Sequence, residues 1–178
     1  KDALKIQADL RVKLNDKFSV KEEVQEQMVK VPVDDEALEE LALLLGLTNI
    51  PEYIEAYDIS HTGGSDNVAG MVVFKDGRPL KDAYRRFAIK GFTGQDDYGS
   101  MREVLSRRFD EYEKFKNENA DEGFGKLPDL ILLDGGKGQV NVALRVLENL
   151  NLHIPVCGMV KDDNHRTRGL YYSNEEIS

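Results

Sequence analysis

The sequence predicts an α/β fold in which one mixed sheet is flanked by helices. Between residues 53 and 89, three strand-like runs follow one another with only short turns between them. Strands joined by short turns are antiparallel. From residue 97 onward, helical and strand-like patterns alternate, and strands joined through a helix lie parallel. We therefore expect a main domain over residues 51–178, with residues 1–50 as an N-terminal helical lead-in.

Length and composition limit the class of protein. The chain has 178 residues, of which 40% are hydrophobic, so it can form one domain with a buried core and an appendage. No apolar run approaches the ~20 residues that span a bilayer, and no basic-then-apolar leader is visible. The single cysteine, Cys157, lies in an apolar run. We interpret it as a core residue of a cytoplasmic protein that has no membrane partner.

The net charge of −9 argues against a nucleic-acid partner, because such proteins usually carry a basic footprint. The distribution of charge weakens that argument. Many acids fall in segments 22–40 and 110–122, whereas basic residues gather in other parts of the chain. For any one basic pair taken singly, ordinary surface solubility is the better explanation.

The lead-in is expected to be helical. Residues 1–30 alternate apolar and polar positions but consist of good helix formers, so pattern and propensity disagree, and we favour a helix. Asp34 and Asp35 then provide an acidic helix start, and Gly46 provides a stop. Asn49-Ile50-Pro51 breaks the pattern and marks the boundary.

The main domain divides into seven expected elements separated by turns and one polar loop, residues 117–126. In chain order these are strands at 53–60, 68–74 and 79–89, a helix at 97–116, a strand at 128–134, a helix at 139–150 and a strand at 154–160. Asp76-Gly77 predicts a hairpin turn between the second and third strands. The tail from Lys161 is charged and rich in turn residues.

Asp134 ends the most apolar strand of the chain, Leu130 to Leu133. Carboxylates are rarely buried unless they are paired or bind a metal. The glycine-rich turn Gly135-Gly136-Lys137-Gly138 and a helix follow. In open α/β sheets, ligands bind at this end of the strands, but an aspartate here can also simply cap the helix.

Asp58 is the second acid in an unexpected position. It shares one face of the first strand with Ile54 and Ala56, because side chains alternate along a strand. The predicted element order is that of the ribonuclease H-like arrangement, in which the first strand lies beside the strand after the first helix. Asp58 and Asp134 would then face each other, and a divalent cation would relieve the repulsion between them.

Four sequence motifs resemble the C-terminal nuclease region of the UvrC family. They are Tyr57-Asp58-Ile59-Ser60-His61-Thr62, Arg85-Arg86-Phe87, Asp96-Asp97-Tyr98 with Met101-Arg102, and Leu133-Asp134-Gly135-Gly136-Lys137-Gly138-Gln139. The resemblance runs from about Pro51 to Leu170. It implies a ribonuclease H-like endonuclease that makes the 5′ incision beside damaged nucleotides in nucleotide excision repair. The implied partners are damaged double-stranded DNA and a UvrB–DNA complex, although the UvrB-contacting segment has no counterpart here.

The resemblance also implies the site. Asp58 and Asp134 correspond to the family's two catalytic, metal-binding aspartates, with Mg²⁺ or Mn²⁺ as the cofactor. The family's catalytic histidine lies downstream of the last residue of this sequence, and none of His61, His153 or His165 sits in its motif. We therefore expect a domain truncated at its C-terminus. An alternative is a non-catalytic module that binds DNA or a repair partner.

Several basic residues are candidates for DNA contacts, since phosphate contacts position DNA without reading its sequence. The candidates are Lys137, Arg85, Arg86, Arg102, Lys161, His165 and Arg166. Lys137 and the amides of the glycine-rich turn could receive a phosphate at the helix start. The turn lacks the spacing of a P-loop, so a nucleotide-hydrolysing enzyme is the weaker rival.

Overall fold

We analysed a computed structural model of the chain. It describes residues 35–62, 66–90, 96–118, 121–161, 163–164, 167–172 and 175–177. The prediction for residues 1–30 lies outside this set. In the described part of the chain, no helix is both long enough and apolar enough to cross a membrane.

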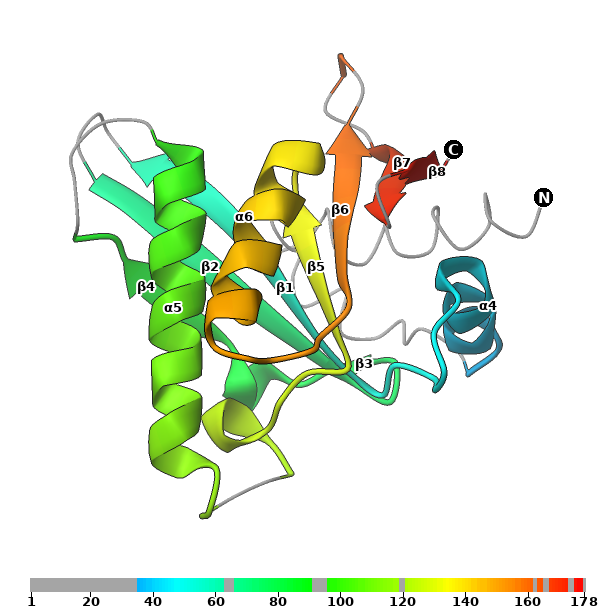
Figure 1. The fold of residues 1–178 in the computed structure, drawn as a ribbon, viewed down its shortest axis with the longest axis horizontal. Coiled ribbons are helices and arrows are strands. Elements are labelled where there is room, and N and C mark those ends of the chain that lie inside the picture. Colours follow the sequence, from blue (N-terminus) through cyan, green and yellow to red (C-terminus); the bar gives the residue numbers. More distant parts are fainter. Residues whose placement is uncertain are drawn as a thin grey trace.

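The centre of the molecule is one mixed sheet (Figure 1). Its strand order is β3-β2-β1-β5-β6-β7-β8, with β4 paired to β2 beyond the end of β3. Strands β1 and β5 are parallel, as are β5 and β6, whereas the other neighbouring pairs are antiparallel. The strands are β1 (Tyr53–Thr62), β2 (Asp66–Lys75), β3 (Arg78–Pro79), β4 (Arg85–Ala88), β5 (Leu130–Asp134), β6 (Val156–Lys161), β7 (Thr167–Tyr172) and β8 (Glu175–Ile177). The mixed α/β sheet is the predicted class.

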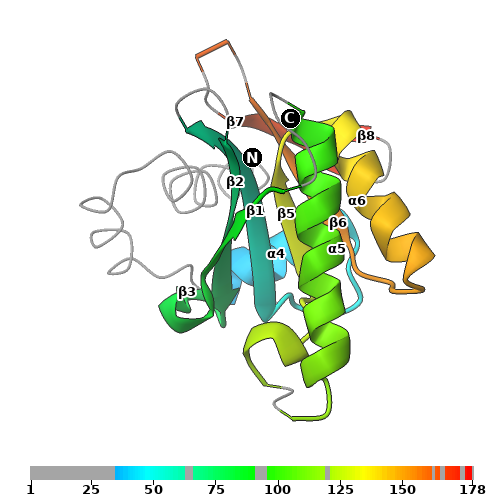
Figure 2. The same ribbon diagram turned by 90° about the vertical axis from the view of Figure 1, so that its left-hand side faces the viewer.

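Helices cover both faces of this sheet. Helices α5 (Asp97–Phe115) and α6 (Lys137–Asn149) lie on one face, and α4 (Asp35–Leu45) lies on the other (Figure 2). Each face therefore has its own apolar layer. Tyr57 and Leu133 belong to the layer beneath α5 and α6, whereas Ala56 and Leu132 belong to the layer beneath α4.

Local signals in the sequence account for the ends of several elements. Gly46 ends α4 with a left-handed φ of 67°, which glycine adopts without steric cost. Asp96 caps α5, because its side chain accepts a hydrogen bond from the Gly99 amide at 2.9 Å. Asp76 and Gly77 both have positive φ, 52° and 79°, as a tight hairpin turn requires. The predictions for Gly46 and for the Asp76-Gly77 turn are confirmed.

Three local predictions are wrong. The expected strand at 79–89 is two strands, β3 and β4, separated by a 3-10 turn at Lys81–Ala83 that buries Ala83. The tail contains β7 and β8, because Leu170 and Tyr171 pack into the two apolar layers. The loop after α5 contains a 3-10 turn at Gly123–Gly125, where the Gly123 amide donates to the Tyr53 hydroxyl at 2.8 Å.

Candidate active site

Asp58 and Asp134 lie at the same level on neighbouring parallel strands. The register of β1 and β5 pairs Ala56 with Leu132 and Tyr57 with Leu133. The next residue on each strand is an aspartate. The strand order predicted from the sequence requires this adjacency, and the structure shows it.

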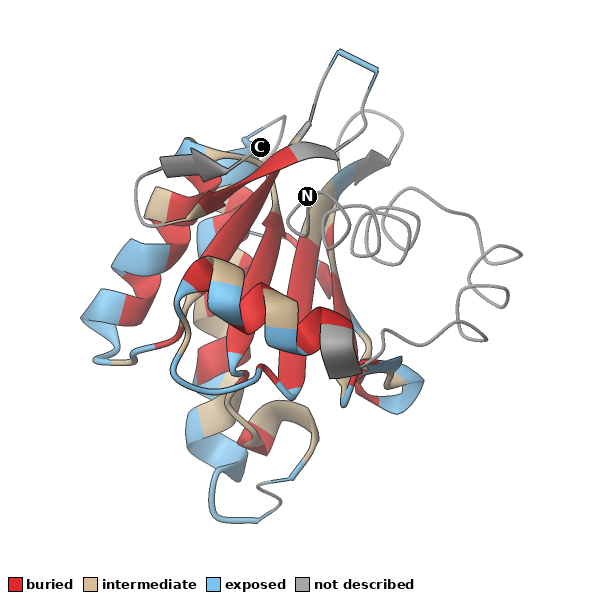
Figure 3. Cartoon of the chain, turned by 90° about the vertical axis from the view of Figure 1, so that its right-hand side faces the viewer, coloured by how far each residue is buried: buried red, intermediate tan, exposed pale blue. Residues whose placement is uncertain are grey.

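Both carboxylates also belong to the same face of the sheet. Side chains alternate along a strand, and the preceding face partners, Ala56 and Leu132, lie in the layer beneath α4. Helix α4 crosses this face nearer the other end of the strands (Figure 3). Asp58 and Asp134 are accordingly half-buried, with an apolar floor on one side and the strand ends on the other.

Glycines hold the chain tightly where it leaves Asp134. Gly135 has a φ of 150°, and a Cβ there would come within 2.6 Å of the Gln139 side chain. Its amide donates to the Met159 carbonyl at 3.2 Å, so this amide is already used and is not available to a phosphate. A Cβ on Gly158 would overlap the Gly135 carbonyl. The close contact between the turn after β5 and strand β6 therefore needs glycine at both Gly135 and Gly158.

A buried ion pair fixes β1 three residues before Asp58, on the opposite face of the strand. Arg108 of α5 donates to the Glu55 carboxylate through Nε and a terminal nitrogen, at 2.9 and 2.8 Å. It also donates to the carbonyls of Phe124 and Lys126. Burial lowers the pKa of Arg108, but the nearby Glu55 carboxylate outweighs burial and leaves that pKa above its usual value. Arg108 therefore stays positively charged. Its hydrogen bonds link α5 to β1 and to the loop that follows α5.

Tyr57 completes this buried network, because its hydroxyl donates to Glu55 Oε1 at 2.5 Å. Burial, reinforced by the Glu55 charge, raises the pKa of Tyr57 well above 10.0. Tyr57 therefore stays neutral, and it immediately precedes Asp58. The strand that carries the first aspartate is thus held by polar contacts on its α5 side.

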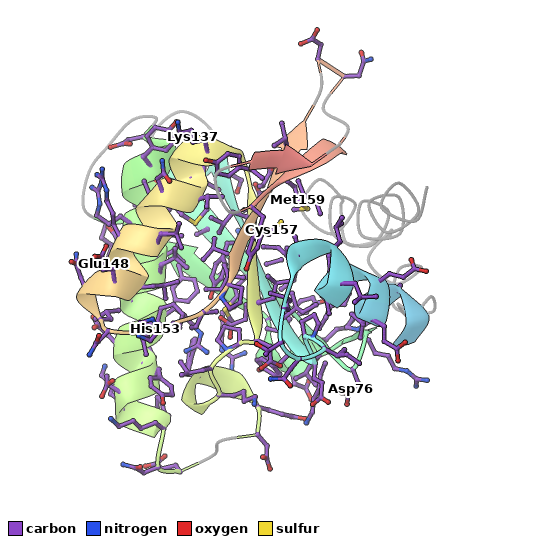
Figure 4. The ribbon with its side chains drawn as sticks, turned by 45° about the vertical axis from the view of Figure 1, so that its right-hand side comes forward. Asp76, Lys137, Glu148, His153, Cys157 and Met159 are labelled. Atoms are coloured by element: carbon purple, nitrogen blue, oxygen red, sulfur yellow. The ribbon has the colours of Figure 1, made fainter. Side chains whose placement is uncertain are left out.

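The predicted DNA-contact residues fall into separate places. Lys137 is exposed at the start of α6, three residues after Asp134, and lies at the upper end of that helix (Figure 4). Arg86 and Arg102 are exposed on β4 and α5. Arg85 is on the α5 face of the sheet, where it donates to the Asp82 and Tyr84 carbonyls.

The remaining candidates are not placed. Lys161 ends β6, but the structure does not describe its side chain. His165 and Arg166 are outside the residues that the structure describes. The His61 side chain is likewise not described. His153 is an exposed loop residue at the end of the sheet opposite Lys137 (Figure 4).

A groove of about 510 Å³ runs along the β4 edge. Its walls include Arg85, Arg86, Phe87, Arg107 and Phe124. Arg85 stacks over the Phe124 ring at 5.2 Å, and Arg107 over the Phe87 ring at 5.4 Å. The groove is also lined by Asp110, Glu111 and Lys114, so its cationic side chains outnumber its two acids.

The two aspartates suit a small divalent cation. Mg²⁺ binds oxygen ligands and usually takes only one or two protein carboxylates, with water and substrate phosphate completing its shell. Within the residues described, no cluster of three or more His, Cys, Asp or Glu side chains could hold a metal. A two-carboxylate site is consistent with that finding and leaves coordination positions for a phosphate.

Sequence reasoning missed Glu55, Arg108 and the glycine Gly158. Glu55 shares a strand face with Tyr53 and Tyr57, so its alternation with buried aromatics was a usable signal. Arg108 gave no such signal, because Arg107 and Arg108 look alike in a helical pattern and only Arg108 faces inward, with 0% exposure.

The sheet order, with two acids at the ends of its central parallel strands, defines a domain of the ribonuclease H-like class. The chain belongs to the UvrC RNAse H endonuclease domain family, whose model matches residues 42–178. It is 50% identical over 171 residues to UvrABC system protein C of Clostridium novyi, and 56% identical over 142 residues to that of Lachnospira eligens. These findings confirm the predicted family of endonuclease domains and, with the sheet order, the predicted fold class, and they give no support to a non-catalytic module.

The chain matches only part of these relatives. The match covers 90% of this chain but 28% of the Clostridium novyi protein, and 79% of this chain but 23% of the Lachnospira eligens protein. Among solved structures, human ENDOV is similar with a TM-score of 0.43 and 12% identity, over 87% of this chain and 79% of that chain. A Ciona intestinalis endonuclease V bound to inosine-containing DNA has the same TM-score, 0.43, with 15% identity, over 64% of this chain and 48% of that chain.

Proposed function

We propose that this domain cuts one strand of damaged double-stranded DNA on the 5′ side of the lesion, using Mg²⁺ or Mn²⁺. The observation that carries the proposal is the register of β1 and β5, which ends with Asp58 and Asp134 side by side on one face. The curated relatives belong to the UvrABC system, which is why we assign nucleotide excision repair, in the cytoplasm, as the setting.

Asp58 and Asp134 would hold the metal, which supplies charge neutralisation at the phosphate and a more acidic bound water. The chain's own residues supply position. The buried Arg108–Glu55 pair holds β1, and the glycine-rich turn holds the end of β5 against β6. Rigid placement matters because the two carboxylates must accept the metal in one fixed geometry.

DNA would approach over the strand ends. Lys137, Arg86 and Arg102 are exposed there or nearby and are proposed to contact the backbone, with Arg85 lining the adjacent groove. Lys161, His165 and Arg166 stay predicted contacts. We propose that the substrate is presented as a complex with UvrB, since the relatives act within a multi-protein system.

Substitution of either aspartate tests the proposal directly. Asp58→Asn and Asp134→Asn remove a metal-binding charge while keeping side-chain size, so we expect incision to fall by at least 10²-fold with DNA binding retained. The assay would use an intact protein of the family that contains this sequence. Glu148→Gln, an exposed acid at the C-terminal end of α6, is the matched control and should cut normally. Normal cutting by either site variant would refute the assignment.

A further inference from the structure

A row of residues crosses the sheet at the level of the two aspartates. Arg86 of β4 is paired with Gly70 of β2, and Gly70 is paired with Asp58 of β1. Asp134 follows on β5 and is paired with Met159 of β6. Residues paired in this way direct their side chains to the same face of a sheet. The Arg86 side chain therefore leaves the backbone on the face of the sheet that carries both carboxylates.

Gly70 leaves a gap in the middle of this row. Its φ is not in the left-handed region, and a Cβ built on it would meet nothing within 4 Å. Neither the backbone nor the packing therefore requires glycine here. A glycine within a strand normally weakens it, and such a residue often marks the close approach of a ligand. Because Gly70 has no side chain, β2 contributes none between Arg86 and Asp58 in this row.

The gap has the size and the charges that suit a phosphate group. Neighbouring strands lie about 4.8 Å apart, so the β4 and β1 backbones are separated by roughly 9–10 Å across Gly70. Arg86 is exposed, and no hydrogen bond or ion pair holds it to another residue in the described part of the chain. Among the described strands β4 is paired only with β2, so β4 is an edge strand and its exposed Arg86 side chain can turn from the edge groove toward Gly70.

We propose that the surface over Gly70 is the subsite for a DNA backbone phosphate, with Arg86 as the residue that clamps it beside Asp58 and Asp134. The proposal rests on the proposed nuclease function and specifies how the substrate is held. A guanidinium group binds phosphate oxygens in a fork with two parallel hydrogen bonds. A phosphate over Gly70 would therefore lie between the Arg86 guanidinium group on one side and the Asp58 and Asp134 carboxylates on the other.

Gly70→Val tests the gap. Valine fits the open space and favours strands, so the melting temperature should be unchanged or higher. Mn²⁺ affinity, measured by calorimetry, should be unchanged. Incision should fall at least tenfold, because the valine side chain occupies the phosphate position. An equal loss of Mn²⁺ affinity would place the effect on the metal site and would overturn the subsite.

Arg86→Gln tests the clamp. Each lost phosphate contact reduces the slope of log K against log salt by about 0.9. We expect that reduction for Arg86→Gln, together with at least tenfold weaker DNA binding, and partial recovery in Arg86→Lys. Arg145→Gln, an exposed arginine of α6 on the other side of the sheet, should keep the parent slope and affinity.

The outcomes separate this inference from the proposed function. Parent-like incision and salt slopes in Gly70→Val and Arg86→Gln, with inactive Asp58→Asn, would overturn the phosphate subsite and leave the nuclease assignment standing. Parent-like incision in Asp58→Asn would overturn both. Loss of incision in all three variants, with a reduced salt slope for Arg86→Gln and Gly70→Val but not for Asp58→Asn, is the expected result.

Discussion

Arg108 and Glu55 form an ion pair in which both residues are fully buried, at 0% exposure. Removing one partner of such a pair leaves an uncompensated buried charge, which costs about 3–5 kcal/mol. We therefore expect Arg108→Leu to lower the free energy of unfolding by that amount in urea denaturation. Replacing both residues with leucine should recover part of the loss.

The matched control is Lys114→Leu on the same helix. Lys114 is paired with Glu111, but its side chain is 65% exposed, and surface pairs contribute about 0–1 kcal/mol. The change should therefore stay below about 1 kcal/mol. Equal losses for Lys114→Leu and Arg108→Leu would show that the buried pair has no special role.

Cys157 provides a prediction about pH. Burial raises the pKa of the Cys157 thiol from 9.0 to about 12, so the thiol stays protonated in the folded chain where the unfolded chain would ionise. The stabilisation from this thiol is complete below pH 9 and is lost as pH rises toward 12. At pH 8 we expect a thiol reagent to modify the folded chain at least 10²-fold more slowly than the urea-unfolded chain. Equal rates would contradict the burial of Cys157.

At the scale of single residues, the sequence identified Asp58 and Asp134 but not the buried ion pair that holds β1. Asp58 and Asp134 stood out because each follows apolar residues on a strand and precedes a turn. Glu55 has the same kind of neighbours, yet its role depends on Arg108, 53 positions away. A single strand pattern cannot reveal a contact of that range.

Among the helices and strands, α4 is an integral part of the core. Leu41 is fully buried against the sheet, at 0% exposure, whereas Leu43 is 82% exposed on the same helix. Leu41→Ala should therefore cost about 2–5 kcal/mol of unfolding free energy, and Leu43→Ala about 0.5 kcal/mol or less. Similar values for the two variants would mean that α4 does not pack as described.

Elements with strong local signals were predictable, and those that depend on pairing were not. The ends of α4 and α5 follow from Gly46 and Asp96, which act on their own backbone neighbours. Strand β7 forms because β6 offers an edge to pair with, and its sequence alone gives no clear strand pattern. The division of residues into a lead-in, 1–50, and a domain, 51–178, stays a prediction; the family match begins at residue 42, inside α4.

The topology of the whole molecule brings the site together. Asp58 and Asp134 are 76 positions apart in the sequence, and they become neighbours only because α5 carries the chain back to form β5 beside β1. The order of strands and helices in the sequence was enough to predict this placement. The sequence could not show that the Arg86 side chain is on the same face of the sheet as the two acids. The 3-10 turn before β4 interrupts the strand, so the alternation of side chains cannot be counted through it from β3 to β4.

Crystals of the chain soaked with DNA and millimolar Mn²⁺ give the most direct test of a metal site shared by β1 and β5. The account predicts one anomalous scattering peak within about 2.0–2.3 Å of carboxylate oxygens from both Asp58 and Asp134. A peak bound elsewhere, or no peak at these two carboxylates with DNA present, would contradict it.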